Sequence, residues 1–241
     1  MKNKFTFGEV MNVCSKTDHT NLKKTAKRED IKDLCEEASY VGAASVCVAP
    51  CYVSYASELL KNSPVKVCTV IGFPNGYSTS KIKCFEAMDA IENGAEEIDM
   101  VLNVGWLKDK RYKDIEHEIS RMSELCHKNN ALLKVIVETC LLTKKEIQEM
   151  CELCIIGNAD YIKTSTGFDK EGANAEDIKL MKETIGNRNL KIKASGGISN
   201  TQDAINMINA GADRLGSSKI VSIGYSVAKF HEENNRENYE R

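Results

Sequence analysis

Short apolar segments alternate with amphipathic segments along most of the chain. The apolar segments have the length and composition of buried strands, and the segments between them repeat their apolar residues with the period of a helix. We expect a helix after each strand. The expected strands cover residues 15–20, 45–49, 65–71, 97–102, 132–138, the beginning of 160–168, 190–194 and 213–216.

Eight strand–helix units in 241 residues predict an α/β protein with parallel strands, closed into a (β/α)8 TIM barrel. The alternative is an open doubly wound sheet, but it would commonly carry a glycine-rich turn after its first strand, and this chain has none. We expect one domain over residues 1–241, with a short N-terminal helix at 1–15. The polar tail at 231–241 is typical of disorder. Capping boxes that begin at Thr143 and Ser199 mark two helix starts.

A weak internal repeat relates four of the strands. Each copy has a glycine or asparagine that ends a helix, then an alanine, and four residues later one of Cys47, Asp99, Lys163 and Gly216. Successive copies lie about two strand–helix units apart, and alternate strands of such a barrel share one interior layer. We therefore expect Cys47, Asp99 and Lys163 to converge on the barrel axis, unless Gly-Ala is merely a common helix ending.

The chain has 33 Lys and Arg residues against 35 Asp and Glu residues, which gives a net charge of −2 and argues against binding to nucleic acid or membrane surfaces. No apolar run reaches the length of a membrane span, and the first residues lack the apolar core of a secretory signal, so we expect a cytoplasmic protein. The ten cysteines are expected to be reduced core residues. Cys151 and Cys154 lie on a helical apolar stripe, so we expect no metal site there.

The stretch DYIKTSTGF, residues 160–168, carries the strongest candidate for chemistry. A lysine, Lys163, stands at the end of its apolar run. Desolvation disfavours a charged amine, and the neutral amine is a nucleophile. The alternatives are a lysine that reaches the rim of the sheet or one that pairs with a carboxylate. Lys193 lies one strand–helix unit later, so the two amines should lie on strands about 4.8 Å apart, where repulsion favours proton loss from one of them.

Charged residues on other strands complete this candidate site. We expect Asp18 and Asp99 at strand ends on the C-terminal mouth of the barrel, where polar residues tend to be catalytic. Lys134, on the strand after Asp99, would form a buried charge pair with it. Structural support and proton relay are equally compatible with Lys134.

Glycines and hydroxyl groups follow the last three strands. Backbone amides at a helix N-terminus bind anions, and the loops after strands seven and eight commonly hold phosphate in such barrels. The candidates are Thr166, Gly167, Gly196, Gly197, Gly216, Ser217 and Ser218. An amine, carboxylates and a phosphate cradle at one mouth indicate a Schiff-base enzyme for a phosphorylated carbonyl compound, namely a class I aldolase or a related lyase.

The chain resembles the deoxyribose-phosphate aldolases over nearly its whole length. The segments that carry the resemblance are TDHT, VCVAP, VIGFPNG, EIDMVLNVG, LLKVIVET, DYIKTSTGF, KASGG and GADRLGSS. The resemblance implies reversible cleavage of 2-deoxy-D-ribose 5-phosphate to D-glyceraldehyde 3-phosphate and acetaldehyde. It implies no metal and no organic cofactor.

The resemblance also implies residue roles. Lys163 would form the Schiff base, and Lys193 would favour its neutral amine. Asp99, with Lys193 and a water molecule, would carry protons between intermediates. Asp18 and Cys47 would line the substrate pocket, although Cys47 could simply fill the core. The glycines and hydroxyls of the last three loops would hold the phosphate.

Two positions depart from the family pattern. Lys219 follows the serine pair where a small residue is usual, so the resemblance leaves open which serine meets the phosphate. Trp106 stands where a small residue is common and would serve packing or an interface. Two other functions compete, a phosphosugar-binding barrel without catalysis and a Schiff-base aldolase for another phosphorylated sugar. We expect a phosphosugar substrate and, from the usual symmetry of such proteins, a homodimer.

Overall fold

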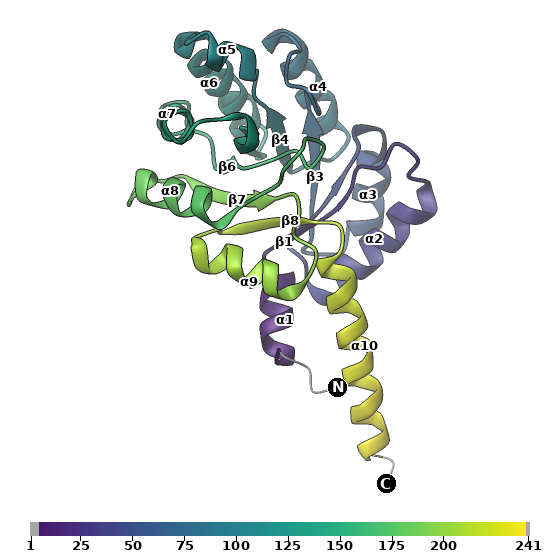
Figure 1. The fold of residues 1–241 in the computed structure, drawn as a ribbon. Helices are drawn as coiled ribbons and strands as arrows, with labels where there is room; N and C mark the ends of the chain where they lie inside the picture. Colours follow the sequence, from purple (N-terminus) through teal and green to yellow (C-terminus); the bar gives the residue numbers. More distant parts are fainter. Residues whose placement is uncertain (1–4, 240–241) are drawn as a thin grey trace.

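Eight parallel strands close into a barrel, as the alternation of strand and helix predicts (Figure 1). The computed structural model describes residues 5–239. Each strand pairs with the next, and the last pairs with the first. The strands are β1 (Thr17–Asn21), β2 (Ser45–Val48), β3 (Lys66–Ile71), β4 (Glu97–Val101), β5 (Leu132–Ile136), β6 (Tyr161–Lys163), β7 (Lys191–Ser195) and β8 (Arg214–Ser217).

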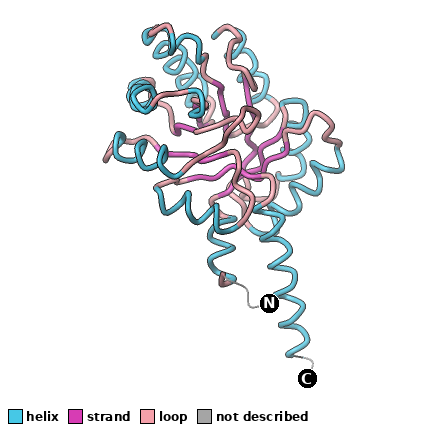
Figure 2. Tube along the Cα trace, viewed as in Figure 1, coloured by secondary structure: helices cyan, strands magenta, loops and turns pink. Residues whose placement is uncertain are grey.

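Helices surround the strands on the outside of the barrel (Figure 2). They are α1 (Phe7–Cys14), α2 (Arg28–Val41), α3 (Val53–Leu60), α4 (Ser80–Glu92), α5 (Val104–Lys108), α6 (Tyr112–Lys128), α7 (Lys144–Ile156), α8 (Ala175–Ile185), α9 (Thr201–Ala210) and α10 (Ile220–Tyr239). Short 3-10 turns occupy Pro50–Tyr52 and Thr139–Leu141. Among the described residues, no helix combines the length and the apolar character that crossing a membrane requires.

The first and last helices project from the same side of the molecule (Figure 1). The short N-terminal helix is present as α1, and the ring of Phe7 stacks on that of His231 in α10 with 4.4 Å between centroids. The polar tail continues as helix α10 to Tyr239, and residues 240–241 lie outside the described residues.

Side-chain caps begin several of the helices, but not always where the sequence pattern suggests. The capping box of Thr143 with Glu146 is confirmed. The second predicted box is wrong, because α9 begins one residue later than expected. Its N-cap is Asn200, whose side chain accepts a hydrogen bond from the backbone N–H of Asp203 at 3.0 Å. An asparagine is as good a cap as a serine, so the motif alone could not choose between adjacent residues.

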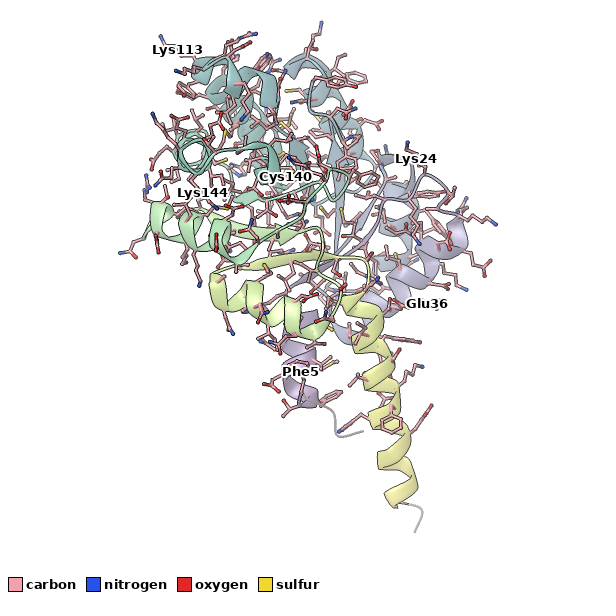
Figure 3. The ribbon with its side chains drawn as sticks, viewed as in Figure 1. Phe5, Lys24, Glu36, Lys113, Cys140 and Lys144 are labelled. Atoms are coloured by element: carbon pink, nitrogen blue, oxygen red, sulfur yellow. The ribbon has the colours of Figure 1, made fainter. Side chains whose placement is uncertain are left out.

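The strands divide their side chains between two environments with a period of two. Val46 and Val48 belong to the apolar core formed with the helices, whereas Cys47 between them belongs to a small interior cluster. Charged side chains such as Lys24 and Lys113 lie on the outside of the protein (Figure 3). The interior of the barrel is therefore a place where the strands remove charged side chains from water.

Trp106 belongs to the packing of the fold. It lies in α5, half-buried against the apolar core, and the guanidinium of Arg111 sits 4.9 Å from the centroid of its ring. These contacts favour the packing role among the two alternatives left by the sequence.

Candidate active site

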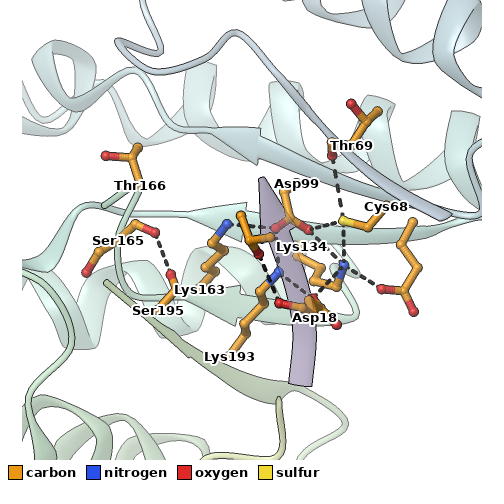
Figure 4. A network of polar contacts seen from close by, with 12 residues as sticks. Asp18, Cys68, Thr69, Asp99, Lys134, Lys163, Ser165, Thr166, Lys193 and Ser195 are labelled. Atoms are coloured by element: carbon orange, nitrogen blue, oxygen red, sulfur yellow. Dashed lines mark hydrogen bonds and ion pairs between the residues drawn. The ribbon is translucent and has the colours of Figure 1, made fainter. Parts of the chain in front are cut away.

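Lys163 ends β6 and extends into the barrel (Figure 4). Its Nζ donates to Asp99 Oδ2 at 2.7 Å. Its side chain is only 5% exposed, yet it lines a cavity of about 530 Å³. The amine is therefore paired with a carboxylate and also within reach of a small molecule in the cavity.

Lys193 lies beside Lys163, as the spacing of the two lysines predicts. The two residues are register partners on β6 and β7. Lys193 Nζ donates to the same oxygen, Asp99 Oδ2, at 2.7 Å and also forms an ion pair with Asp18. Burial would lower the pKa of Lys193, but the charges of Asp18 and Asp99 outweigh it and raise that pKa above its ordinary value. Lys193 is thus the amine that stays charged, which leaves Lys163 as the candidate nucleophile.

Lys134 forms the predicted pair with Asp99. Its Nζ lies 2.8 Å from Asp99 Oδ1 and 2.6 Å from Glu97 Oε2, and the side chain is fully buried. Burial would lower the pKa of Lys134, but the carboxylates around it, Asp99 foremost, raise it well above its ordinary value. Lys134 contacts Asp99 through Oδ1, not through the Oδ2 atom that accepts from Lys163, which suits structural support better than proton relay.

Asp99 is ionised by its neighbours. Burial would raise the pKa of this carboxyl group, but the charges of Lys134, Lys163 and Lys193 hold it well below its usual range. The residue is the middle one of β4 and is fully buried, not at the end of the strand. The carboxylate therefore accepts hydrogen bonds from three lysine side chains.

Asp18 was expected at the end of its strand, and that placement is wrong. It is the second residue of β1, which continues to Asn21, and it is fully buried. Its carboxylate pairs with Lys193 and with Arg214 Nη1, the latter at 2.5 Å. Burial would raise the pKa of Asp18, but these cations and Lys134 lower it below its ordinary range. Asp18 therefore holds cations beneath the cavity, and it is not among the residues that line it.

The charges inside the barrel balance only when one amine is neutral. The ion-paired cluster consists of Lys134, Lys163, Lys193, Arg214, Asp18, Glu97 and Asp99. Four cations face three carboxylates, so loss of one proton makes the cluster neutral. Lys163 has a single ion-pair partner among the described residues, whereas each of the other cations has at least two. Among the four basic residues of the cluster, Lys163 is therefore the one that the fewest carboxylates contact.

Two thiols lie beside Asp99. The Sγ atoms of Cys47 and Cys68 and a carboxylate oxygen of Asp99 all lie within 4.8 Å of one another. Cys47 is buried beneath the cavity and does not line it. These atoms could serve as metal ligands, but Asp99 already accepts from three lysine side chains. Two of these, Lys134 and Lys193, have raised pKa values, and their positive charges would repel a divalent cation. The donors suit a hydrogen-bond network better than a metal.

The cavity lies where the loops after β6, β7 and β8 meet. The candidate phosphate residues all line it, namely Thr166, Gly167, Gly196, Gly197, Gly216, Ser217 and Ser218. Gly196 and Gly197 have φ angles of 82° and 76°, which favour glycine. A side chain at Gly216 would place its Cβ 2.9 Å from that of Ser195, so the backbone there stays bare.

The two serines before α10 have different surroundings. Ser217 is buried, and its Oγ donates to the carbonyl of Ile198 at 2.7 Å and accepts from the N–H of Lys219 at 3.1 Å. It therefore fixes the start of the helix. Ser218 is exposed and lines the cavity, which makes it the serine available to a ligand.

Thr166 is held by a carboxylate that was not among the predicted site residues. Its Oγ1 donates to Glu138 Oε2 at 2.5 Å, and its backbone N–H also donates to that group. Glu138 is mostly buried, and burial raises the pKa of its carboxyl group. The contact ties the loop after β5 to the loop after β6 at the edge of the cavity.

Comparison with known proteins identifies the family. A model described as a DeoC/LacD family aldolase matches residues 13–227. The chain belongs to this family of aldolases. The aldolase is 51% identical to the deoxyribose-phosphate aldolase of Clostridioides difficile (strain 630) over 214 residues, 89% of this chain and 96% of that protein. It is also 51% identical to that of Geobacillus sp. (strain WCH70) over 212 residues, 88% and 94% of the two chains.

Solved structures agree with this assignment. The deoxyribose phosphate aldolase from Aeropyrum pernix superposes with a TM-score of 0.84 at 31% identity, over 92% of this aldolase and 94% of that chain. The family resemblance inferred from motifs such as DYIKTSTGF is therefore confirmed.

Some residues of the aldolase site were missed in the sequence. Glu97 and Arg214 each lie two residues before a candidate, Asp99 and Gly216, and so face the same side of their strands. That period could have revealed them. Cys68 carried no comparable signal, because only the pairing of β3 with β4 brings it to Asp99.

Proposed function

We propose that this aldolase cleaves 2-deoxy-D-ribose 5-phosphate reversibly to D-glyceraldehyde 3-phosphate and acetaldehyde through a Schiff base on Lys163. The observation that carries the mechanism is the position of Lys163, which lines the cavity and has one ion-pair partner among the described residues, Asp99. The names of the close relatives support the choice of substrate.

The neutral Lys163 amine attacks the aldehyde carbon of the open-chain sugar, and loss of water from the carbinolamine gives the imine. The protonated imine withdraws electrons as the bond between C2 and C3 breaks. The C3 hydroxyl loses its proton and becomes the aldehyde of glyceraldehyde 3-phosphate. The enamine left on Lys163 gains a proton at C2, and hydrolysis of the resulting imine releases acetaldehyde.

Asp99 and Lys193 are the proposed proton carriers for these steps. Asp99 Oδ2 lies 2.7 Å from both amines, so one carboxylate oxygen touches the nucleophile and the neighbouring ammonium. A water molecule in the cavity would extend this path to the substrate. Lys134 contacts Asp99 and Asp18 contacts Lys193 on the side away from the cavity, and Cys47 packs beside Asp99.

The phosphate would bind at the other end of the cavity. The N-terminus of α10 attracts an anion, and the bare backbone at Gly167, Gly196 and Gly197 lets it approach closely. Ser218 would donate a hydrogen bond. Anchoring the phosphate there leaves the other end of the sugar free to reach Lys163.

Trapping the imine tests this function. The protein is incubated with acetaldehyde and sodium borohydride, and the reduced two-carbon adduct is located by peptide mass spectrometry. We expect the adduct on Lys163 and its loss in Lys163→Ala. The control is Lys191→Ala, at the exposed start of β7, in which Lys163 should form the adduct as in the wild type. A folded wild-type protein without an adduct would exclude the Schiff base and favour phosphosugar binding without catalysis.

The choice of substrate needs a separate measurement. Release of acetaldehyde from 2-deoxy-D-ribose 5-phosphate, followed with a coupled alcohol dehydrogenase, should depend on Lys163. Labelling of Lys163 without turnover of this sugar would instead indicate an aldolase for another phosphorylated sugar.

We further propose that the aldolase is a single-domain homodimer that acts in the cytoplasm. The closed barrel supports one domain, and the ten cysteines, all thiols in the structure, support a reducing compartment. Light scattering coupled to gel filtration should give twice the chain mass of 26.8 kDa. A monomer or a larger assembly in that measurement would contradict the dimer. Cell fractionation should recover the aldolase activity in the cytosolic fraction.

A further inference from the structure

The two carboxylate oxygens of Asp99 have different partners (Figure 4). Oδ2 accepts from Lys163 and Lys193, the two amines of the proposed chemistry. Oδ1 accepts from Lys134 Nζ at 2.8 Å and from Cys68 Sγ at 3.2 Å. Because the two oxygens are rigidly linked, the groups that hold Oδ1 also decide where Oδ2 points.

Cys68 is enclosed by the barrel. It lies on β3 and is fully buried, and its register partner on β4 is Glu97. Its Sγ accepts from Lys134 Nζ at 3.2 Å and donates to Asp99 Oδ1. Lys134 can only donate and the Asp99 carboxylate can only accept, so a thiol between them satisfies both.

The protonation state of Cys68 agrees with this geometry. Burial and the negative charge of Asp99 raise the pKa of the Cys68 thiol well above its ordinary value. The sulfur therefore keeps a proton at neutral pH. A thiolate at the same place would repel the carboxylate.

We propose that Cys68 is a positioning residue of the aldol reaction. Its thiol and Lys134 hold Asp99 Oδ1, so that Oδ2 stays between the amines of Lys163 and Lys193. This inference rests on the proposed function, since it assigns a task within the same site. It goes further by giving a role to a cysteine that otherwise counts as core filling.

The surroundings of the Cys68 thiol differ from those of the buried cysteines in the apolar core. Cys126 and Cys154 are as deeply buried as Cys68, but they belong to the apolar core between helices and strands. Cys68 belongs instead to the interior cluster with Cys47 and Val70. Cys126 is therefore a matched control, because its truncation removes a buried thiol without touching Asp99.

Three substitutions separate the hydrogen bond of Cys68 from the space that its side chain fills. Cys68→Ser keeps a donor of similar size, Cys68→Val fills the space without a donor, and Cys68→Ala removes both. If the thiol positions Asp99, kcat should fall about tenfold or more in the valine and alanine variants, because small displacements of catalytic groups are costly. Cys68→Ser should stay within about threefold of wild type, since it preserves the hydrogen bond. KM should change little in all three, because Cys68 does not line the cavity.

The readouts are kcat and KM with 2-deoxy-D-ribose 5-phosphate and the rate of borohydride trapping at Lys163. Circular dichroism and thermal melts confirm the fold, and Cys126→Ala should keep the wild-type kcat. Cys68→Val with wild-type kcat would overturn the proposal. Equal decreases in kcat in the serine and valine variants would also overturn it, as would a lower Tm with no change in kcat.

The same experiment separates this inference from the function on which it rests. Absence of the Lys163 adduct in the wild-type protein would defeat the proposed Schiff base itself. An adduct in the wild-type protein with unchanged rates in Cys68→Val would defeat only the role of Cys68. If Cys68→Ala fails to fold, the valine and serine variants still decide the question.

Discussion

Replacing Asp18 with asparagine should destabilise the aldolase strongly. The side chain is fully buried and faces three cations. Its carboxylate forms an ion pair with Lys193 and lies 2.5 Å from Arg214 Nη1 and 3.6 Å from Lys134 Nζ. Asparagine retains the shape and one acceptor oxygen but loses the charge. The protonated cluster would then hold four cations against two carboxylates, Glu97 and Asp99.

The expected loss follows from the burial of these charges. Removing one partner of a buried ion pair typically costs about 3–5 kcal/mol, because the remaining charge is left uncompensated. The amide oxygen of asparagine can still accept one hydrogen bond, worth about 1 kcal/mol. We therefore expect the free energy of unfolding to fall by about 3 kcal/mol at pH 7.

The effect should depend on pH in a defined direction. The pKa of Asp18 is lowered in the folded protein, so its contribution to stability is present above the unfolded pKa of about 3.9 and is lost as the pH falls below it. The difference between wild type and Asp18→Asn should therefore be constant from about pH 5 to pH 8 and shrink toward pH 3.5.

Urea unfolding followed by circular dichroism measures both quantities. Glu152→Gln serves as a control, because Glu152 pairs with Arg188 at the surface, where both side chains are more than 40% exposed. Such a pair contributes about 0–1 kcal/mol. The reasoning is refuted if Asp18→Asn loses no more than this control with an unchanged m value, or if its deficit grows as the pH falls.

Three further substitutions test the helix caps and the cavity. Thr143→Ala removes the capping box of α7 and should cost about 1 kcal/mol, or about 2–4 °C in Tm, with unchanged kinetics; an unaltered Tm would contradict the assigned cap. Ser217→Ala should lower Tm by a similar amount, since its Oγ joins Ile198 to the start of α10. Ser218→Ala should leave Tm unchanged but raise KM for the phosphosugar severalfold. The opposite assignment of the two serines would be indicated if Ser217→Ala alone raised KM.

The sequence by itself determined the barrel and the core of its chemistry. Alternation of strand and helix predicted eight parallel units, and the interval between Lys163 and Lys193 predicted that they would be neighbours. The Gly-Ala repeat predicted that Asp99 and Cys47 would both lie in the barrel interior. These inferences depend on periods along the chain, which survive an error of one or two residues at a strand end.

Only the tertiary structure decided the partners of each charge. Asp18 lies inside the barrel and not at its mouth, because β1 continues to Asn21. No period in the sequence marks the residue at which strand pairing ends. Arg214 and Cys68 reach the cluster across β8–β1 and β3–β4 contacts, between residues far apart in the chain. The number of ion pairs that each amine makes depends on such contacts. That number distinguishes Lys163 from the other three cations of the cluster, because Lys163 has a single ion pair among the described residues and also lines the cavity.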